Sequence, residues 1–121
     1  MQALVVDDSS TMRKVLKSIL VGAGFDVLEA KGGPEALDCL KQNSADIALL
    51  DWNMPEMTGI ELLARLRAEH TYDAMKVMMV TTESDQSEVG RALSVGADEY
   101  VMKPFTKDSI LDKLRILGLL Q

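Results

Sequence analysis

Short apolar runs alternate along the chain with segments whose apolar residues repeat every three to four positions. Five such runs occur: Ala3–Val6, Phe25–Ala30, Ile47–Leu50, Val77–Val80 and Tyr100–Met102. Their length is typical of strands, and the periodicity between them is typical of amphipathic helices. Strands that alternate with helices of this length predict right-handed βαβ units and a parallel sheet with helices on both faces.

The helical segments carry recognisable start and stop signals. Ser9 and Ser10 can cap a first helix that ends near Gly22 and Gly24, and Pro34 suits the first turn of a second helix. The apolar stripes of the later helices include Leu37 and Leu40, then Ile60, Leu63 and Leu66, then Val89, Ala92 and Leu93, and finally Ile110, Leu111, Leu114 and Leu117.

The second strand differs from the other strands. The runs before Asp7, Asp51 and Thr81 are continuously apolar, as expected for strands buried on both faces, whereas Asp26 and Glu29 interrupt the second run. We therefore predict a three-layer α/β sandwich with the second strand at an edge. The five units use the whole chain, 1–121, so we expect one domain and no output domain.

Composition and charge narrow the possible functions. The net charge of −6 and the absence of clustered Lys and Arg argue against a nucleic-acid partner. The chain shows neither a signal peptide nor an apolar run long enough to cross a membrane. Cys39 is the only cysteine, so no internal disulfide can form. We expect a cytoplasmic, monomeric protein.

Candidate reactive side chains follow four of the five predicted strands. They are Asp7 and Asp8 after the first strand, Asp51 after the third, Thr81 and Thr82 after the fourth, and Lys103 after the fifth. In open parallel sheets, functional sites lie outside the carboxyl ends of the strands, so we expect these side chains to converge. Three clustered carboxylates repel one another, by roughly 4 kcal/mol per pair at about 4 Å, and one lysine compensates them poorly.

A hard divalent cation would offset this repulsion, and Mg²⁺ suits a pocket of oxygen ligands. Carboxylates, a magnesium ion, an ammonium group and a hydroxyl around one point favour phosphoryl transfer. In this interpretation Asp51 is the nucleophile, Asp7 and Asp8 hold the metal, Lys103 neutralises phosphoryl oxygens, and Thr81 donates a hydrogen bond to one of them.

The other candidates for chemistry are weaker. His70, the only histidine, lies in a polar stretch that predicts a surface loop, so no Ser-His-Asp or Cys-His catalytic set can be built there. Cys39 lies on the apolar stripe of the second helix, and we expect a packed core thiol.

Several motifs give the whole chain a resemblance to bacterial response-regulator receiver domains, most closely those of chemotaxis. They are Asp7-Asp8-Ser9-Ser10-Thr11-Met12-Arg13, Asp51-Trp52-Asn53-Met54-Pro55, Met57-Thr58-Gly59, Val80-Thr81-Thr82-Glu83 and Tyr100-Val101-Met102-Lys103-Pro104-Phe105. The resemblance implies a flavodoxin-like fold with strand order 2-1-3-4-5. It also implies that Asp51 takes phosphate from a chemotaxis-type histidine kinase.

The family pattern also assigns roles to single residues. It places Mg²⁺ on Asp8, Asp51 and the backbone carbonyl of Asn53, with Asp7 assisting through water. It implies a cis bond between Lys103 and Pro104.

A two-state switch is a further implication of the resemblance. Thr81 would move toward the phosphoryl group while Tyr100 swings inward. The surface formed by the fourth helix, the fifth strand and the fifth helix would then control a partner. That partner would be a flagellar-motor switch protein or another output protein, and a phosphatase could reset the switch. Asn53 and Glu83 match positions that influence phosphoryl lifetime. Thr82 departs from the frequent Ala and could narrow the path of the attacking water.

Two alternatives remain open at the level of sequence. The chain could be a phosphate shuttle that passes its phosphoryl group to a downstream histidine. A haloacid-dehalogenase-like phosphatase also uses an Asp nucleophile with Mg²⁺, although that family usually places an Asp-x-Asp pattern after the first strand and adds a cap domain.

Overall fold

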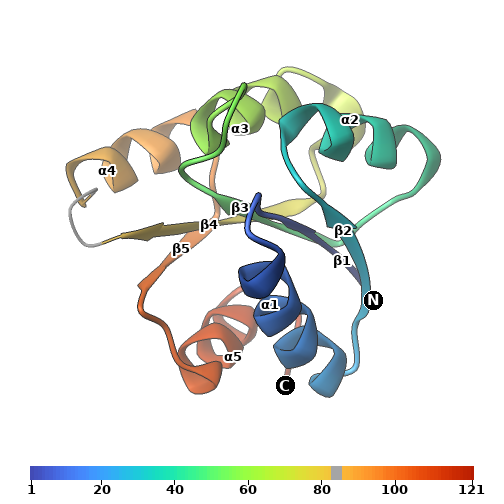
Figure 1. Cartoon of the computed structure of the whole chain (residues 1–121), viewed down its shortest axis with the longest axis vertical. Helices are drawn as coiled ribbons and strands as arrows, with labels where there is room; N and C mark the ends of the chain where they lie inside the picture. The colour runs from blue at the N-terminus through green and yellow to red at the C-terminus, as the bar shows by residue number, and fades with distance from the viewer. Residues whose placement is uncertain (83–85) are drawn as a thin grey trace.

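Five parallel strands form one sheet in the order β2-β1-β3-β4-β5 (Figure 1). The strands are β1 (Gln2–Val6), β2 (Asp26–Ala30), β3 (Ile47–Asp51), β4 (Lys76–Thr82) and β5 (Glu99–Lys103). The computed structural model describes residues 1–82 and 86–121. The predicted flavodoxin-like order and the edge position of β2 are confirmed.

Helices cover both faces of the sheet, which confirms the predicted three layers. They are α1 (Ser10–Gly22), α2 (Gly33–Gln42), α3 (Gly59–Arg67), α4 (Gln86–Val95) and α5 (Lys107–Ile116), with a short 3₁₀ helix, η1 (His70–Tyr72), after α3. Figure 1 shows α1 and α5 on one face and α2, α3 and α4 on the other. Among the described residues, no helix combines the length and apolar character of a membrane span.

The central strands supply side chains to two separate cores. In β4, Val77 and Met79 pack with the helices α2 to α4, whereas Met78 and Val80 pack with α1 and α5. All four of these side chains are fully buried. This division explains the continuously apolar sequence of the central strands, because successive side chains of a strand point to opposite faces.

Side-chain caps fix the starts of the two helices that follow the acidic residues. The Ser9 hydroxyl accepts a hydrogen bond from the backbone N–H of Met12 at 3.2 Å, at the start of α1. At the start of α3, Thr58 and Glu61 form a capping box. Each cap satisfies N–H groups that would otherwise lack partners, which ties the loops after β1 and β3 to rigid elements.

Three strands end later than the apolar runs predicted. Asp51 is the last residue of β3 and pairs with Val80, while Thr82 and Lys103 pair at the ends of β4 and β5. The prediction that these residues come after their strands was therefore wrong by one or two positions. Backbone pairing does not require apolar side chains, so the ladder continues into the polar residues.

The two residues set aside as unreactive lie close to where the sequence placed them. His70 begins η1 instead of lying in an irregular loop, but its side chain is 97% exposed. Cys39 packs against the core of α2 to α4, as expected, although it is only half-buried.

Candidate functional site

Three carboxylates meet at the carboxyl ends of β1 and β3. Asp7 and Asp8 follow β1, Asp51 ends β3, and each can present an oxygen that lies within 4.8 Å of the other two. The two strands are neighbours in the sheet, which brings residues far apart in sequence together. Asp7 and Asp51 are 1% and 6% exposed, whereas Asp8 is exposed. The convergence predicted from the sequence is therefore present.

The loop after β1 holds Asp7 by its backbone and by one carboxylate oxygen. The Ser9 N–H donates to Asp7 Oδ1 at 2.8 Å, and the Arg13 guanidinium donates to the Asp7 carbonyl at 2.7 Å. Arg13 also lies 3.5 Å from the Glu29 carboxylate. Sequence reasoning gave Arg13 no role of its own, because nothing in its spacing shows that the side chain folds back onto the loop.

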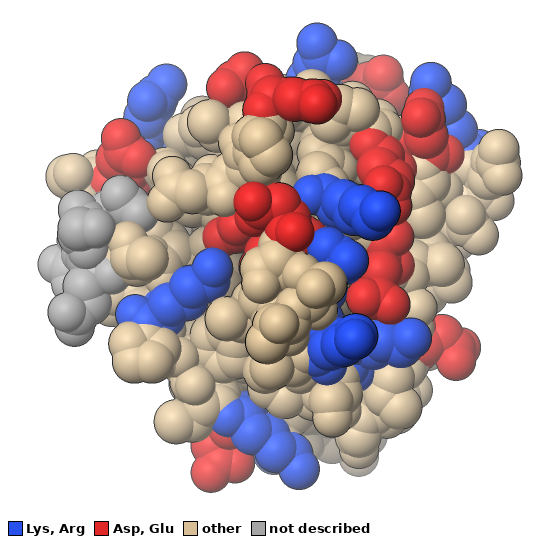
Figure 2. All heavy atoms as spheres, in the orientation of Figure 1, with Lys and Arg blue, Asp and Glu red and all other residues tan. Residues whose placement is uncertain are grey.

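Lys103 reaches into the cluster from the end of β5. Its Nζ lies 3.0 Å from Asp51 Oδ1 and 3.9 Å from Asp7 Oδ2. The Lys103–Pro104 peptide bond is cis, as the resemblance implied. Figure 2 shows acidic side chains gathered near the middle of the visible face with basic side chains beside them. One ammonium group thus faces three carboxylates.

Burial makes this cluster electrostatically unfavourable. Desolvation raises the pKa of Asp7, although the Ser9 N–H and the positive charge of Lys103 lower it in part. Desolvation also raises the pKa of Asp51, against the hydrogen bond from Lys103 and with the repulsion of Asp7. Both carboxylates therefore hold a proton more tightly than an exposed aspartate does.

One buried atom of the cluster has the properties of a metal ligand. Asp7 Oδ2 is buried and has no hydrogen-bond partner among the described residues, because Lys103 at 3.9 Å is too distant to donate. A buried carboxylate oxygen without a partner is costly unless a cation satisfies it. The donors are all oxygens, as Mg²⁺ prefers. The side chains present therefore fit the expected ion.

The remaining predicted site residues lie around this cluster. Thr81 is 1% exposed, and its hydroxyl donates to the Thr82 carbonyl over a long 3.4 Å. Asn53 lies beyond β3 with an exposed side chain, and the metal role of its carbonyl stays a prediction. Tyr100 is half-buried in β5. Glu83 lies outside the described residues.

The segment between the end of β3 and the start of α3 contains two positions whose structural role the sequence did not reveal, although Gly59 belongs to one of the family motifs. Glu56 adopts a positive φ of 70°, an uncommon conformation for a residue with a side chain. A Cβ on Gly59 would collide with the backbone oxygen of Asp51, while the Gly59 N–H donates to the Trp52 carbonyl at 2.9 Å. Gly59 therefore lets α3 start directly against the end of β3.

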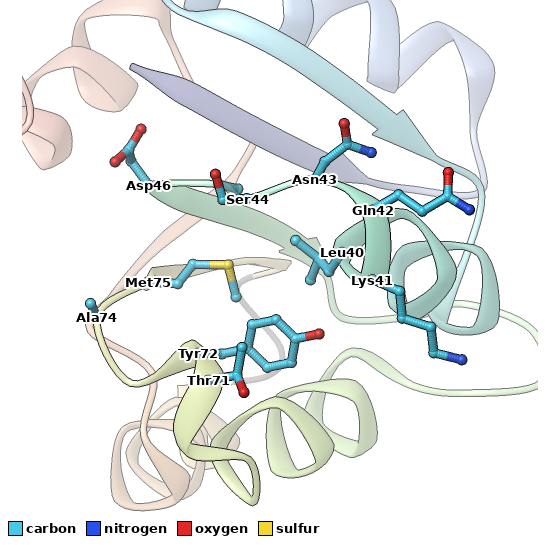
Figure 3. Close-up of a pocket in the computed structure, with 11 residues that line it drawn as sticks. Leu40, Lys41, Gln42, Asn43, Ser44, Asp46, Thr71, Tyr72, Ala74 and Met75 are labelled. Carbon is cyan, nitrogen blue, oxygen red and sulfur yellow. The ribbon is translucent and has the colours of Figure 1, made fainter.

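Cavities lie at both ends of the sheet. A hollow of about 340 Å³ opens beside the acidic cluster and includes Asp8 and Glu56 in its lining. A larger cavity of about 450 Å³ lies at the opposite end, where Leu40, Tyr72 and Met75 contribute to its lining (Figure 3). None of the clustered carboxylates lines the larger cavity, so the smaller hollow is the one relevant to the site.

Comparisons with known proteins decide the family. The model of the response regulator receiver domain matches residues 3–115. This chain belongs to the response-regulator receiver family. The match covers nearly the whole chain, as expected from the resemblance, and this family is not a classical enzyme family.

Individual relatives place this receiver domain near the chemotaxis regulators. It is 49% identical to a chemotaxis protein CheY homolog of Campylobacter jejuni, over 98% of this chain and 93% of the relative. It is 43% identical to chemotaxis protein CheY1 of Helicobacter pylori, over 97% and 96%. The solved structure of chemotaxis protein CheY4 of Vibrio cholerae matches with a TM-score of 0.89 and 33% identity, covering 95% of this chain and 96% of that chain. The receiver domain is thus similar to CheY in sequence and in fold.

Proposed function

We propose that this receiver domain is a stand-alone switch in which Asp51 accepts a phosphoryl group from a histidine kinase. The observation that carries the proposal is the contact between Lys103 and Asp51, 3.0 Å long, inside a cluster of three carboxylates. An ammonium group at this point can neutralise the oxygens of a phosphoryl group attached to Asp51. The relatives that are named chemotaxis proteins support the same assignment.

The transfer exchanges one bond for another. A carboxylate oxygen of Asp51 forms a bond to phosphorus as the phosphorus–nitrogen bond of a phosphohistidine breaks, and the imidazole leaves with a proton from solvent. Lys103 orients Asp51 through Oδ1 and stays close to the charge that develops. Thr81, at the end of the neighbouring strand, donates its hydroxyl to a phosphoryl oxygen.

Asp7, Asp8 and Asp51 would hold Mg²⁺, with the carbonyl of Asn53 as a further ligand. When bound, the ion supplies positive charge that offsets the carboxylates and the incoming phosphate. Asp7 Oδ2, which has no hydrogen-bond partner among the described residues, supports this assignment. With the ion bound, the buried Asp51 would stay ionised and able to attack.

Phosphorylation is proposed to act on the surface formed by α4, β5 and α5. Thr81 and Tyr100 would move together, and the changed surface would bind a flagellar-motor switch protein. A chemotaxis-type histidine kinase would be the input, and a phosphatase would reset the protein. The proposal also includes a cytoplasmic, monomeric protein. Asn53, Thr82 and Glu83 would tune the lifetime of the phosphoryl group.

Phosphorylation by a small phosphodonor tests the central claim. With Mg²⁺ and acetyl phosphate, intact-mass spectrometry should show one added phosphoryl group on the wild type and none on Asp51→Asn. Asp26→Asn, a change of an exposed aspartate on β2, is the matched control and should be modified normally. Modification of Asp51→Asn would disprove the assignment. Transfer of the phosphoryl group from this protein to a histidine phosphotransfer protein would instead show that the chain is a phosphate shuttle.

A further inference from the structure

A closed set of contacts surrounds Tyr100 at the outer edge of the sheet. The Lys113 Nζ lies 4.8 Å from the centre of the Tyr100 ring and 3.0 Å from Glu99 Oε1. The same Glu99 oxygen accepts the backbone N–H of Tyr100 at 3.0 Å. Glu99 therefore anchors both the ammonium group and the backbone of the residue whose ring the ammonium group contacts.

This cluster is more than a solvated surface ion pair. The side chains of Lys113 and Glu99 are 27% and 16% exposed. Lys113 precedes Leu114, which is fully buried, so the backbone that carries the ammonium group is fixed in the core with α1. A cation that is partly withdrawn from water interacts more strongly with an aromatic face than an exposed one does.

Lys113 contacts the ring from the far side of the sheet. Thr81 follows Val77 and Met79 in the alternation of β4, so its side chain faces the layer of α2, α3 and α4. Tyr100 packs against the same layer, whereas α5 belongs to the opposite layer. Because β5 is an edge strand, side chains from the two layers can meet at that edge, as Lys113 and Tyr100 do.

We propose that Lys113, held by Glu99, is a positioning residue that keeps the Tyr100 ring in contact with its ammonium group and so opposes the switch. We call this position of the ring the outward position. The inference rests on the proposed function, in which the Tyr100 ring moves inward along the face that carries Thr81. Such a movement takes the ring away from α5 and breaks its contact with the ammonium group. Glu99 keeps Lys113 on α5, so the cation does not follow the ring.

The expected effect follows from the strength of a single contact of this kind. Lys113→Met should raise the ratio of inward to outward Tyr100 by about two- to fivefold, both in the unmodified and in the phosphorylated protein. Lys113→Arg keeps a cation that can stack on the ring, so the ratio should stay near the wild-type value. Glu99→Gln keeps an acceptor for the Tyr100 N–H but holds Lys113 less firmly, and should give a smaller increase.

Three-bond couplings from the Tyr100 Cγ to its backbone nitrogen and carbonyl carbon, measured by NMR, give the two populations. These couplings report the χ1 angle and are insensitive to the removed charge. Lys107→Met, which removes an exposed cation from the same helix, is the control and should leave the ratio unchanged.

The possible results separate this inference from the function on which it rests. An unchanged ratio in Lys113→Met, or an equal increase in Lys107→Met, would overturn the role of Lys113 while leaving phosphorylation of Asp51 intact. A wild-type Tyr100 that keeps one χ1 angle after phosphorylation would overturn the role of Lys113 and the proposed switching movement together. Absence of phosphorylation by intact mass would count against the proposed function itself.

Discussion

Asp7 is a residue whose burial disfavours the fold when its carboxyl group is ionised. Its carboxylate is almost fully buried, and one oxygen is satisfied by the Ser9 N–H while the other has no hydrogen-bond partner in the described part of the chain. Its pKa is raised chiefly by desolvation. A carboxyl group whose pKa is higher in the folded than in the unfolded chain destabilises the fold once it is ionised.

The sign of the pH dependence follows from this shift. Between the ordinary value of 3.8 and the raised pKa of Asp7, the folded chain binds more protons than the unfolded chain. The free energy of unfolding therefore falls as pH rises through this window, and the cost of the ionised Asp7 is fully present above the raised pKa.

Asp7→Asn should therefore stabilise the metal-free protein at neutral pH, by about 1–3 kcal/mol, the usual cost of an unsatisfied buried polar group. The amide nitrogen that this substitution introduces would donate toward the neighbouring carboxylates instead of repelling them. Urea unfolding in a chelator should show the gain at about pH 7 and little of it near pH 3, which lies below the ordinary pKa of 3.8, so that the carboxyl group is largely protonated in both states. An equal or lower midpoint at neutral pH would contradict the interpretation, and the exposed Asp26→Asn provides the control.

At the scale of elements, Arg67 joins the end of α3 to three other segments. Its guanidinium donates to the carbonyls of Tyr72 at 2.8 Å, Met75 at 2.8 Å and Gly96 at 2.9 Å. It also contacts the Asp98 carboxylate at 2.8 Å. The C-terminal end of α4 and the start of β4 are thereby fixed to α3, on the face that includes Tyr100.

Arg67→Met should lower the free energy of unfolding by about 2–4 kcal/mol, because three carbonyl groups and the Asp98 carboxylate lose the hydrogen bonds that Arg67 donates. Arg65→Met, an exposed neighbour on the same helix, should change it by less than about 0.5 kcal/mol. Urea unfolding compares the two variants. Amide hydrogen exchange should additionally show faster exchange at Gly96 and Ala97 in Arg67→Met, and equal exchange in both variants would refute the anchoring role.

The helices and strands could be predicted well from the sequence, because burial sets the repeat of apolar residues along each of them. The central strands are apolar at every position since they supply two cores, and β2 carries Asp26 and Glu29 because only one neighbour strand and partial cover surround it. The convergence of Asp7, Asp51 and Lys103 followed from the rule on strand ends alone. The role of Asp51 as acceptor came from the family pattern, since charge arguments treat the three carboxylates alike.

Contacts that depend on side-chain direction could not be predicted. Arg67 and Lys113 are cations on amphipathic helices, and nothing in their spacing distinguishes them from the exposed Arg65 or Lys107. Their partners are backbone carbonyls and a ring brought close by the packing of separate elements. The positive φ of Glu56 is likewise set by the loop geometry and not by residue type.

For the whole molecule, the proposed magnesium site would make folding and metal binding one linked equilibrium. A cation that binds the folded chain at Asp7, Asp8 and Asp51 stabilises it, by about 1.4 kcal/mol at ten times the dissociation constant. For a domain of this size the thermal midpoint of the wild type should then rise by roughly 4–8 °C. Trp52, beside Asp51 and 5% exposed, gives the dissociation constant by fluorescence titration.

Asp7→Asn separates this linkage from general salt effects. The substitution should raise the thermal midpoint without metal but reduce the stabilisation that magnesium gives. Without metal, the variant should melt above the wild type, since the repulsion is gone. With magnesium, the difference between the two thermal midpoints should shrink or change sign, because the variant has lost one carboxylate and binds the ion more weakly. Thermal unfolding at matched ionic strength, with sodium chloride in place of magnesium chloride, is the control. A magnesium-dependent increase of equal size in both proteins would show that Asp7 takes no part in binding the ion, and that its burial must have another cause.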